Sequence, residues 1–417
     1  MTQASAHEAF AQNLDSRHAK GSIWRVVFML STILTILFLA TLIITILDDA
    51  FGYVVMVNDV DPSTLARGGT LLEGQNKDQL LLTLEEHLST RRYRALEREI
   101  PMAQRTAPDL LEIALTEIVK PQVAQTFNLF ESLFGKTEIL QEVSEKYPDG
   151  QLVFRSWVSM RFLTAPQSSR PMSAGVMTAI KGTVLTILIT ILVSFPVGIA
   201  AAIWLEEYAS DNTLNRIIRV NIYNLAGVPS IIYGMLGLAV FVRGMESFTS
   251  GAMFGVSTGG EVANGRTIMS AGLTLALLIL PVIIINAQEA LRAIPGSLRQ
   301  SSLAVGATKW QTIAHHVLPA SFDRILTGAV LAISRAIGET APLVVVGAST
   351  FLTRDPDSVF SKFTTLPIQI YQWTSRPQAE FRHLAAAAIL VLLVLMLSLN
   401  AFAIITRNKL RKQKRFG

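Results

Sequence analysis

The sequence predicts an all-α transmembrane protein with six membrane spans and a small α+β lobe inserted after the first span. Half of the 417 residues are hydrophobic and only 16% are charged, whereas a soluble domain has about 25% charged residues. The hydrophobic residues occur in uninterrupted runs of about 20, the length of a helix that crosses a bilayer. Residues 48–175 separate the first run from the others and are acidic. These observations exclude a disordered chain and argue against a soluble enzyme.

The spans follow from the apolar runs. The first run is too long for a cleaved signal peptide, and no small-residue cleavage site follows it. The fifth is interrupted by two charges, and the last has none. The later five spans belong to one unit, residues 176–406. The expected spans are Val26–Leu47, Thr183–Leu205, Val220–Val242, about Thr267 to Gln288, Ile325 to about Leu352, and Leu384–Thr406.

The charges between the spans predict the orientation. Cytoplasmic loops carry an excess of Lys and Arg, and long loops do not count in this comparison. Two short loops on one side, 243–266 and 351–382, hold 6 Lys and Arg. On the other side 15 occur, in 1–25, 206–219, 289–324 and the basic tail 407–417. We therefore expect both termini in the cytoplasm and residues 48–175 outside. The bases adjoin membrane spans, which favours this explanation over nucleic-acid binding.

The segment 48–175 is too long for a simple connector. It contains 18 Asp and Glu against 13 Lys and Arg, a balance typical of a solvated surface. Apolar periodicity and turn residues predict its elements. These are a helical stretch Asn76–Ile100, a helix Pro108–Phe134 broken near Pro121, and a strand Leu152–Phe162 with Phe51–Val57 as its partner.

Two charges inside the fifth span are the first candidate site. Arg335 and Glu339 lie four residues apart, on one face of a helix, so they can pair. A charge at the bilayer centre costs about 3 kcal/mol on insertion scales. One interpretation is a structural ion pair that holds helices together. The other, which we favour, is a pathway-lining pair in which arginine meets an anion and glutamate holds the arginine in place.

Other chemistry is weakly represented. The chain has no cysteine, so disulfides, thiol chemistry and Cys-ligated zinc are excluded. His315 and His316 are adjacent, so on a helix they point apart, and we expect no metal site. No Gly-x-x-x-x-Gly-Lys-Ser/Thr sequence exists to cradle a nucleotide phosphate. We expect Lys181, at the start of the second span, to extend toward the outer headgroups.

The inner segment 289–320 is the second candidate site. Its pattern predicts two short helices joined at Gly306-Ala307, with apolar side chains from Leu303, Trp310, Ile313 and Val317. An amphipathic helix pair facing the cytoplasm fits the groove of a partner protein. The same pattern also fits a helix that lies on the lipid surface, and periodicity does not separate the two.

This segment resembles the coupling loop of the permeases of type I ABC importers. That family has Glu-Ala-Ala, three residues, Gly, nine residues and Ile-x-Leu-Pro. Gly306, Leu318 and Pro319 match the pattern. Gln300 stands at the position of the glutamate, and the two alanines and the isoleucine are replaced by Ser301, Ser302 and His316.

Two further stretches are similar to those of phosphate-importer permeases. They are Asn224-Leu-Ala-Gly-Val-Pro-Ser-Ile-Ile-Tyr-Gly234 and Arg335-Ala-Ile-Gly-Glu-Thr-Ala-Pro-Leu343. The Ala-Pro-Leu after Gly-Glu-Thr favours one of the two permease subunits that such importers contain. The resemblance covers the first span and residues 176–417, and it assigns no role to residues 48–175.

The resemblance implies a six-helix type I ABC importer permease core in the bacterial plasma (inner) membrane. It implies a transport subunit rather than an enzyme, with ATP and Mg bound by the partner ATPase. The implied partners are a second permease, a dimer of ATP-binding subunits, an extracytoplasmic phosphate-binding protein and membrane lipid. Arg335, Glu339 and Thr340 are then candidates for the substrate pathway. Candidates for ATPase coupling are Leu303, Gly306, Ala307, Trp310, Leu318 and Pro319.

Three alternatives remain open from the sequence. The substrate could be another oxyanion, such as sulfate or molybdate. A stand-alone channel or secondary carrier is disfavoured by the coupling loop and by the lack of charges in the spans other than the fifth. A membrane-anchored sensor or assembly protein would act through residues 48–175.

Overall fold

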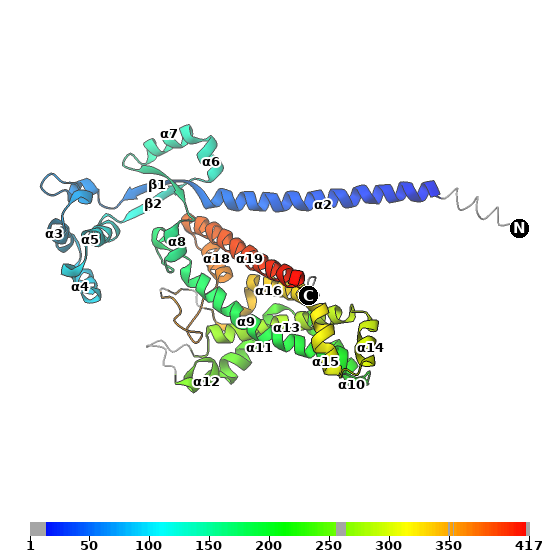
Figure 1. Cartoon of the computed structure of the whole chain (residues 1–417). Coiled ribbons are helices and arrows are strands. Elements are labelled where there is room, and N and C mark those ends of the chain that lie inside the picture. Colours follow the sequence, from blue (N-terminus) through cyan, green and yellow to red (C-terminus); the bar gives the residue numbers. More distant parts are fainter. Residues whose placement is uncertain (1–13, 256–263, 349–350, 353, 414–417) are drawn as a thin grey trace.

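A computed structural model describes residues 14–255, 264–348, 351–352 and 354–413. In this part of the chain five helices are long and apolar enough to cross a membrane, or six spans if one bent helix pair counts as one. Figure 1 shows their arrangement. The expectation of six spans is met only with the bent pair included. The five helices are α2 (Leu14–Ala50), α9 (Met177–Ile203), α13 (Ile268–Arg292), α16 (Leu318–Gly338) and α19 (Ala379–Gln413).

Helix α13 lies at the centre of the core and packs against α9 and α16 (Figure 1). Two glycines allow α9 and α13 to approach closely. A Cβ at Gly272 would lie 2.6 Å from Ile189, and one at Gly198 would lie 2.6 Å from Ile283. The hydroxyl of Thr190 donates to the carbonyl of Gly272 at 3.1 Å. Small residues and hydroxyl donors are typical of helix contacts in membranes.

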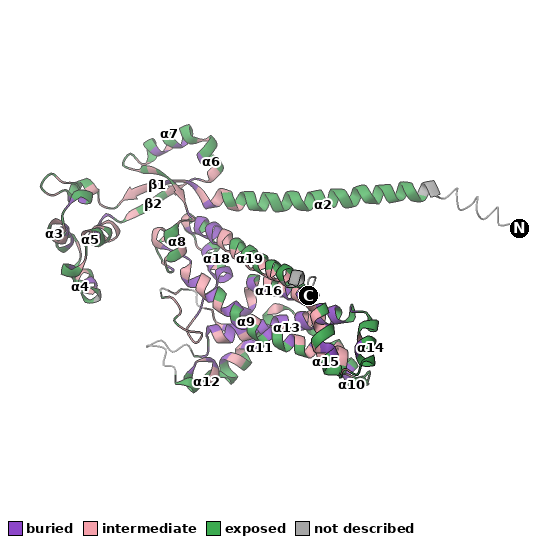
Figure 2. Ribbon diagram, viewed as in Figure 1, coloured by how far each residue is buried: buried purple, intermediate pink, exposed green. Residues whose placement is uncertain are grey.

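Helix α2 behaves differently from α13. None of its most apolar stretch is buried within the chain, and Figure 2 shows its surface exposed over almost its whole length. It contacts the rest of the chain near its end, where it leads directly into the lobe at Ala50. The basic tail expected at 407–417 belongs to α19 as far as Gln413; residues 414–417 lie outside the described residues.

The third expected span, Val220–Val242, is wrong as a single helix. The chain forms α10 (Thr213–Ala226) and α11 (Ser230–Gly237), and a π-helical stretch continues α11 to Gly244. The helix axis bends by 104° between the two parts. Pro229 precedes α11, has no N–H to donate and disfavours helical backbone at Val228. Helix α10 therefore ends before the proline.

The fifth expected span is also divided. Helix α16 ends at Gly338, Glu339 adopts an extended conformation, and α17 (Ala341–Val346) begins beside Pro342. The missing N–H of a proline is tolerated in the first turn of a helix but not in its interior. The expected continuous helix from Ile325 to Leu352 is therefore wrong after Gly338.

The lobe is built on an antiparallel sheet in the order β2-β1-β3. The predicted pairing of the first strand with the 152 region is confirmed, because Val54 lies opposite Val153. The strands are β1 (Phe51–Asn58), β2 (Pro121–Thr126) and β3 (Gln151–Ser156). Helices of the lobe are α3 (Lys77–His87), α4 (Thr90–Glu99), α5 (Ala107–Ala114), α6 (Leu129–Phe134), α7 (Lys136–Lys146) and α8 (Met160–Thr164).

Three predictions for the lobe differ from the structure. The helix expected over Pro108–Phe134 breaks near Pro121 as predicted, but the strand β2 follows the break, because Lys120 takes a left-handed backbone with φ 43° and Pro121 then starts the strand. The expected strand Leu152–Phe162 stops at Ser156. The Ser159 side chain accepts from the N–H of Phe162 and caps α8 instead. The single expected helical stretch Asn76–Ile100 is two helices, α3 and α4.

The remaining helices are short. They connect the long helices at the two ends of the bundle, and two of them form the inner segment discussed below. They are α12 (Glu246–Thr249), α14 (Gly296–Ala304), α15 (Lys309–Thr312) and α18 (Leu366–Thr374).

Candidate functional site

Arg335 and Glu339 form an ion pair where α16 ends. The Nε of Arg335 lies 3.4 Å from Oε1 of Glu339, and their side chains are 50% and 19% exposed. Glu339 is the first residue after the helix rather than part of its face, and Thr340 follows it directly at the start of α17. The contact occupies one nitrogen of a guanidinium that has five N–H donors. Arg335 therefore keeps donors available for an anion while Glu339 restrains it.

The two stretches singled out in the sequence contact each other. A Cβ at Gly234 would lie 2.7 Å from the Cα of Pro342, so α11 and α17 touch backbone to backbone. Tyr233 is buried, and its hydroxyl donates to the carbonyl of Leu225 at 2.7 Å. This bond crosses the bend between α10 and α11, and the same carbonyl also accepts from the N–H of Val228 at 3.1 Å. Residues about 110 positions apart thus form one structural unit beside Arg335.

The inner segment is the predicted pair of short helices. Helices α14 and α15 are joined by a turn at Gly306, whose φ of 85° is the left-handed conformation that glycine adopts without strain. The hydroxyls of Ser302 and Thr312 lie 2.9 Å apart and tie the helices together. Thr308 caps α15 in a reciprocal pair with Gln311.

An exposed apolar surface crosses this turn. Leu303, Val305 and Trp310 are exposed, and we call them the coupling patch. Gly306 is exposed too, while Ala307, Leu318 and Pro319 are half-buried. The expectation that Ile313 and Val317 also face a partner is wrong, because both are buried within the bundle. They hold the segment to the core, whereas the coupling patch faces outward.

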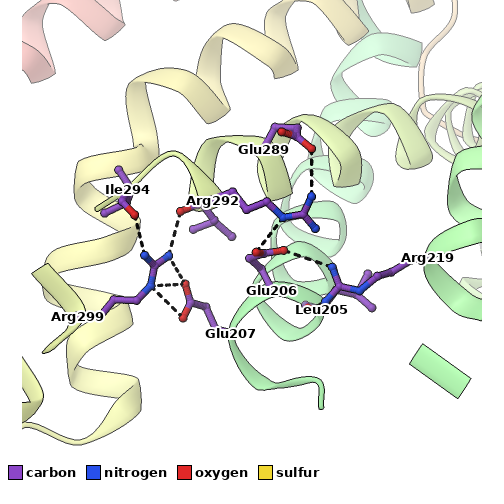
Figure 3. A network of polar contacts seen from close by, with 9 residues as sticks. Leu205, Glu206, Glu207, Arg219, Glu289, Arg292, Ile294 and Arg299 are labelled. Atoms are coloured by element: carbon purple, nitrogen blue, oxygen red, sulfur yellow. Dashed lines mark hydrogen bonds and ion pairs between the residues drawn. The ribbon is translucent and has the colours of Figure 1, made fainter. Parts of the chain in front are cut away.

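The π-helical turn that continues α9, Trp204–Tyr208, fixes this segment by ion pairs (Figure 3). Glu207 accepts from Nη2 of Arg299 at 2.7 Å and from its Nε at 3.1 Å. Arg299 also donates to the carbonyls of Ile294 at 2.8 Å and Leu291 at 2.9 Å. The Glu207 side chain is only 8% exposed. One arginine thus joins α14, the end of α13 and the end of α9.

A second set of contacts lies beside the first (Figure 3). Glu206 accepts from Arg292 at 3.0 Å and contacts Arg219 of α10 at 3.4 Å. Arg219 also donates to the carbonyl of Leu205. Sequence reasoning took the two glutamates only as the end of the second span. The signal that could have identified their role is the arginines of the following inner segments, which complement them in charge.

At the opposite end of α9, Lys181 does not extend freely as expected. Its Nζ lies 2.5 Å from Oδ2 of Asp355, and the hydroxyl of Thr178 donates to the same carboxylate at 2.8 Å. Burial acts to raise the pKa of Asp355, but these hydrogen bonds and the ammonium charge outweigh it and hold the pKa below its ordinary value. The loop 351–365 is thereby fastened to α9.

Metal binding finds no support in the described residues. They contain no cluster of three or more His, Asp or Glu placed to hold an ion. His315 and His316 are exposed in the π-helical turn that precedes α16.

Comparison with known proteins bears on these sites. Residues 194–412 match the family described as "Binding-protein-dependent transport system inner membrane component". This range contains the ion pair, the coupling patch and both sets of inner contacts, and it leaves out α2 and the lobe.

Individual relatives are also similar. The "Probable ABC transporter permease protein YqgI" of Bacillus subtilis is 30% identical, over 59% of this chain and 83% of that protein. The "Phosphate transport system permease protein PstA" of Yersinia pestis is 35% identical, over 55% of this chain and 71% of that protein. PstA 1 of Mycobacterium tuberculosis is 32% identical, over 58% and 73%. A solved structure of the MetNI methionine ABC transporter is 18% identical over 58% of this chain and 99% of that chain, with a TM-score of 0.42.

Proposed function

Because this chain belongs to the family of inner membrane components of binding-protein-dependent transport systems, we propose that it forms half of the translocation pathway of an ATP-driven phosphate importer. That it is a permease subunit of a binding-protein-dependent ABC transporter, and not itself an enzyme, follows from the family. The choice of phosphate is supported by the PstA relatives, one of which is 35% identical.

The observation that carries the proposal is the half-exposed Arg335. A phosphate oxyanion requires a cation with several N–H donors, and arginine supplies them in a planar fork. Glu339, at 3.4 Å, orients the guanidinium and lowers its net attraction for an anion. A site on a transport pathway must bind weakly enough to release its substrate. Thr340 follows Glu339 in the break between α16 and α17 and offers a hydroxyl group.

The partners follow from the same proposal. A dimer of ATP-binding subunits, which holds the ATP and Mg, contacts the coupling patch on the cytoplasmic side, together with Gly306 and Ala307. Leu318 and Pro319 begin α16, which follows that contact in the chain and carries Arg335 near its other end. A second permease completes the pathway, and an extracytoplasmic phosphate-binding protein delivers the substrate. Both termini lie in the cytoplasm and the lobe lies outside, as the distribution of Lys and Arg favours.

Transport by the purified complex tests the role of Arg335. The complex is captured through a tag on this chain, reconstituted in liposomes with the binding protein, and assayed for ATP-dependent uptake of radioactive phosphate. A hydrogen bond to a charged group contributes about 1.5–3 kcal/mol, so Arg335→Gln is expected to lower uptake by about 10- to 100-fold. Arg335→Lys keeps the charge and is expected to retain more activity.

Arg324→Gln is the matched control, since Arg324 is exposed on the same helix. Its uptake should stay close to that of the unmodified complex. Wild-type uptake by assembled Arg335→Gln would refute the pathway role. Equal competition by sulfate or molybdate would refute phosphate as the preferred substrate, and recovery of the chain without an ATPase would refute the coupling assignment.

A further inference from the structure

A pocket of about 720 Å³ lies where the lobe meets the beginning of α19. Figure 1 shows β2, α8 and the start of α19 close together in this region. The walls come from the end of the helical turn before β2, from β3 and α8, from the segment 169–173, and from Gln378, Glu380 and Phe381. Arg335 and the coupling patch are not part of it. It is therefore a separate site from the one described above.

The lining of this pocket is strongly cationic. Four basic side chains face one carboxylate, that of Glu380, among the described residues that line it. Two of these basic residues make only long ion pairs with carboxylates that do not line the pocket. Arg161 lies 3.5 Å from Glu112, and Arg170 lies 3.9 Å from Glu117, which is already bound to another arginine. The basic residues of the lining are Lys120, Arg155, Arg161 and Arg170.

Arg155 is the basic residue of the lining that most favours an anion. Its Nε is buried and has no hydrogen-bond partner in the described structure. Its guanidinium lies 4.9 Å from the ring of Trp157, and one nitrogen contacts the sulfur of Met172 at 3.2 Å. Burial, and then the nearby charge of Arg161, lower the pKa of Arg155. A buried donor on a charged group is costly to leave without an acceptor, and no carboxylate supplies one here.

The N-terminal end of α19 adds to the positive electrostatic potential of the pocket. The pocket includes the first turn of a 35-residue helix, whose N-terminal end carries a partial positive charge and free N–H groups. Ser169 and Ser173 add hydroxyl groups to the same lining. Planar guanidinium donors with hydroxyls and a helix N-terminus suit a tetrahedral oxyanion.

We propose that this pocket binds a phosphate group, held by Arg155, Arg161 and Arg170. The same chemistry has two sources, free inorganic phosphate and the headgroup of an anionic phospholipid. The second source is reasonable because α19, which begins in the pocket, is a candidate membrane span. The inference goes beyond the proposed transport function, and binding in detergent does not depend on which side of the membrane the lobe occupies.

The test uses the full chain, purified in a glycosidic detergent and phosphate-free buffer, with Arg335→Gln as the parent. This background removes the proposed pathway site, so failure of one proposal is distinguishable from failure of the other. Titration calorimetry with inorganic phosphate measures the first source. Native mass spectrometry with added phosphatidylglycerol measures the second.

Two pocket variants are compared with that parent. Arg155→Gln removes the half-buried cation, and the double variant Arg161→Gln with Arg170→Gln removes two exposed ones, which keeps the test valid if the first variant fails to fold. Each is expected to weaken binding about tenfold or more, the effect of one lost charge-assisted hydrogen bond. Arg91→Gln with Arg94→Gln is the matched control, because both arginines are exposed on α4.

Each outcome is decisive. Phosphate binding that the pocket variants lose, and the α4 control keeps, supports a free-oxyanion site. Retention of phosphatidylglycerol with the same pattern supports a lipid-headgroup site. If neither ligand binds the parent more tightly than both pocket variants, or if the α4 control loses as much, the proposal is overturned.

Discussion

Removing the charge of Glu207 should loosen the inner segment without unfolding the bundle. Glu207→Gln keeps the size of the side chain and one oxygen acceptor, but it places an amide NH2 against the guanidinium of Arg299. Breaking a buried ion pair by removing one partner costs about 3–5 kcal/mol. Arg299 is 24% exposed and keeps its bonds to two carbonyls, so we expect about 2 kcal/mol here.

Hydrogen exchange measures this effect directly. A loss of about 2 kcal/mol in local stability raises the population of the open state about 30-fold, and amide exchange rises in proportion. The increase should be confined to peptides that cover α14, residues 296–304, with α9 and α13 unchanged. Exchange is followed by mass spectrometry on the purified chain in detergent.

Glu289→Gln is the matched control for this experiment. Glu289 is 59% exposed and contacts Arg292 at 3.4 Å, and exposed pairs contribute about 0–1 kcal/mol. Exchange in α14 should then change about fivefold at most. If Glu207→Gln leaves α14 as protected as before, or if both variants have the same effect, the ion pair does not hold the segment and the reasoning is refuted.

Three further substitutions test other contacts. Gly234→Ala places a methyl group against the backbone of Pro342, so it should destabilise the fold by about 1–3 kcal/mol and lower the melting temperature. The control is Gly227→Ala, whose added methyl group meets only ordinary contacts and should leave the melting temperature unchanged. Equal melting temperatures of the two variants would contradict the close approach of Gly234 to Pro342. Trp310→Ala should weaken binding of the ATPase about tenfold or more, with melting unchanged; undiminished binding contradicts the coupling patch. Asp355→Asn should lower the melting temperature at neutral pH. Because its folded pKa lies below the ordinary value, the carboxylate stabilises the fold above about pH 4 and the difference should shrink below it; a difference that persists at lower pH excludes this role.

The sequence predicted the spans well where apolar runs were uninterrupted. Helix α13 extends four residues past the expected end at Gln288, to Arg292, which is a normal error at a helix end. The failures lie at prolines. Hydropathy averages over a whole run and does not register a change of direction, so the breaks before Pro229 and at Glu339 were missed.

The candidate site was predicted in its components but not in its connections. Arg335 and Glu339 were found because charges are rare inside spans. Their position near Gly234 was not predictable, because the contact between Gly234 and Pro342 joins segments about 110 residues apart. Glu206 and Glu207 were missed for a similar reason. A charge that ends a span and a charge that anchors a neighbouring helix look alike until the partner arginines are placed in space.

In the lobe, the pairing of β1 with β3 followed from alternation, but β2 did not. Its sequence, Pro-Gln-Val-Ala-Gln-Thr, lacks strong alternation, and its neighbours on both sides are helical. The left-handed backbone at Lys120 is what ends the preceding helix. Nothing in the identity of a lysine signals that conformation, which tertiary packing imposes.

The hydrogen bond from Tyr233 to Leu225 has a mechanical consequence. It joins the two helices across the 104° bend. The Leu225 carbonyl also accepts from the N–H of Val228 at 3.1 Å, so straightening the bend would lose the net contribution of the tyrosine hydrogen bond, about 0.5–1.5 kcal/mol. Helices α10 and α11 are therefore held together as one bent unit. Helix α11 contacts α17 at Pro342, next to the break that follows Arg335. Helix α10 carries Arg219, which contacts Glu206 beside the inner segment. Through these two contacts, the bent unit connects the break beside Arg335 with the ion pairs that hold the inner segment.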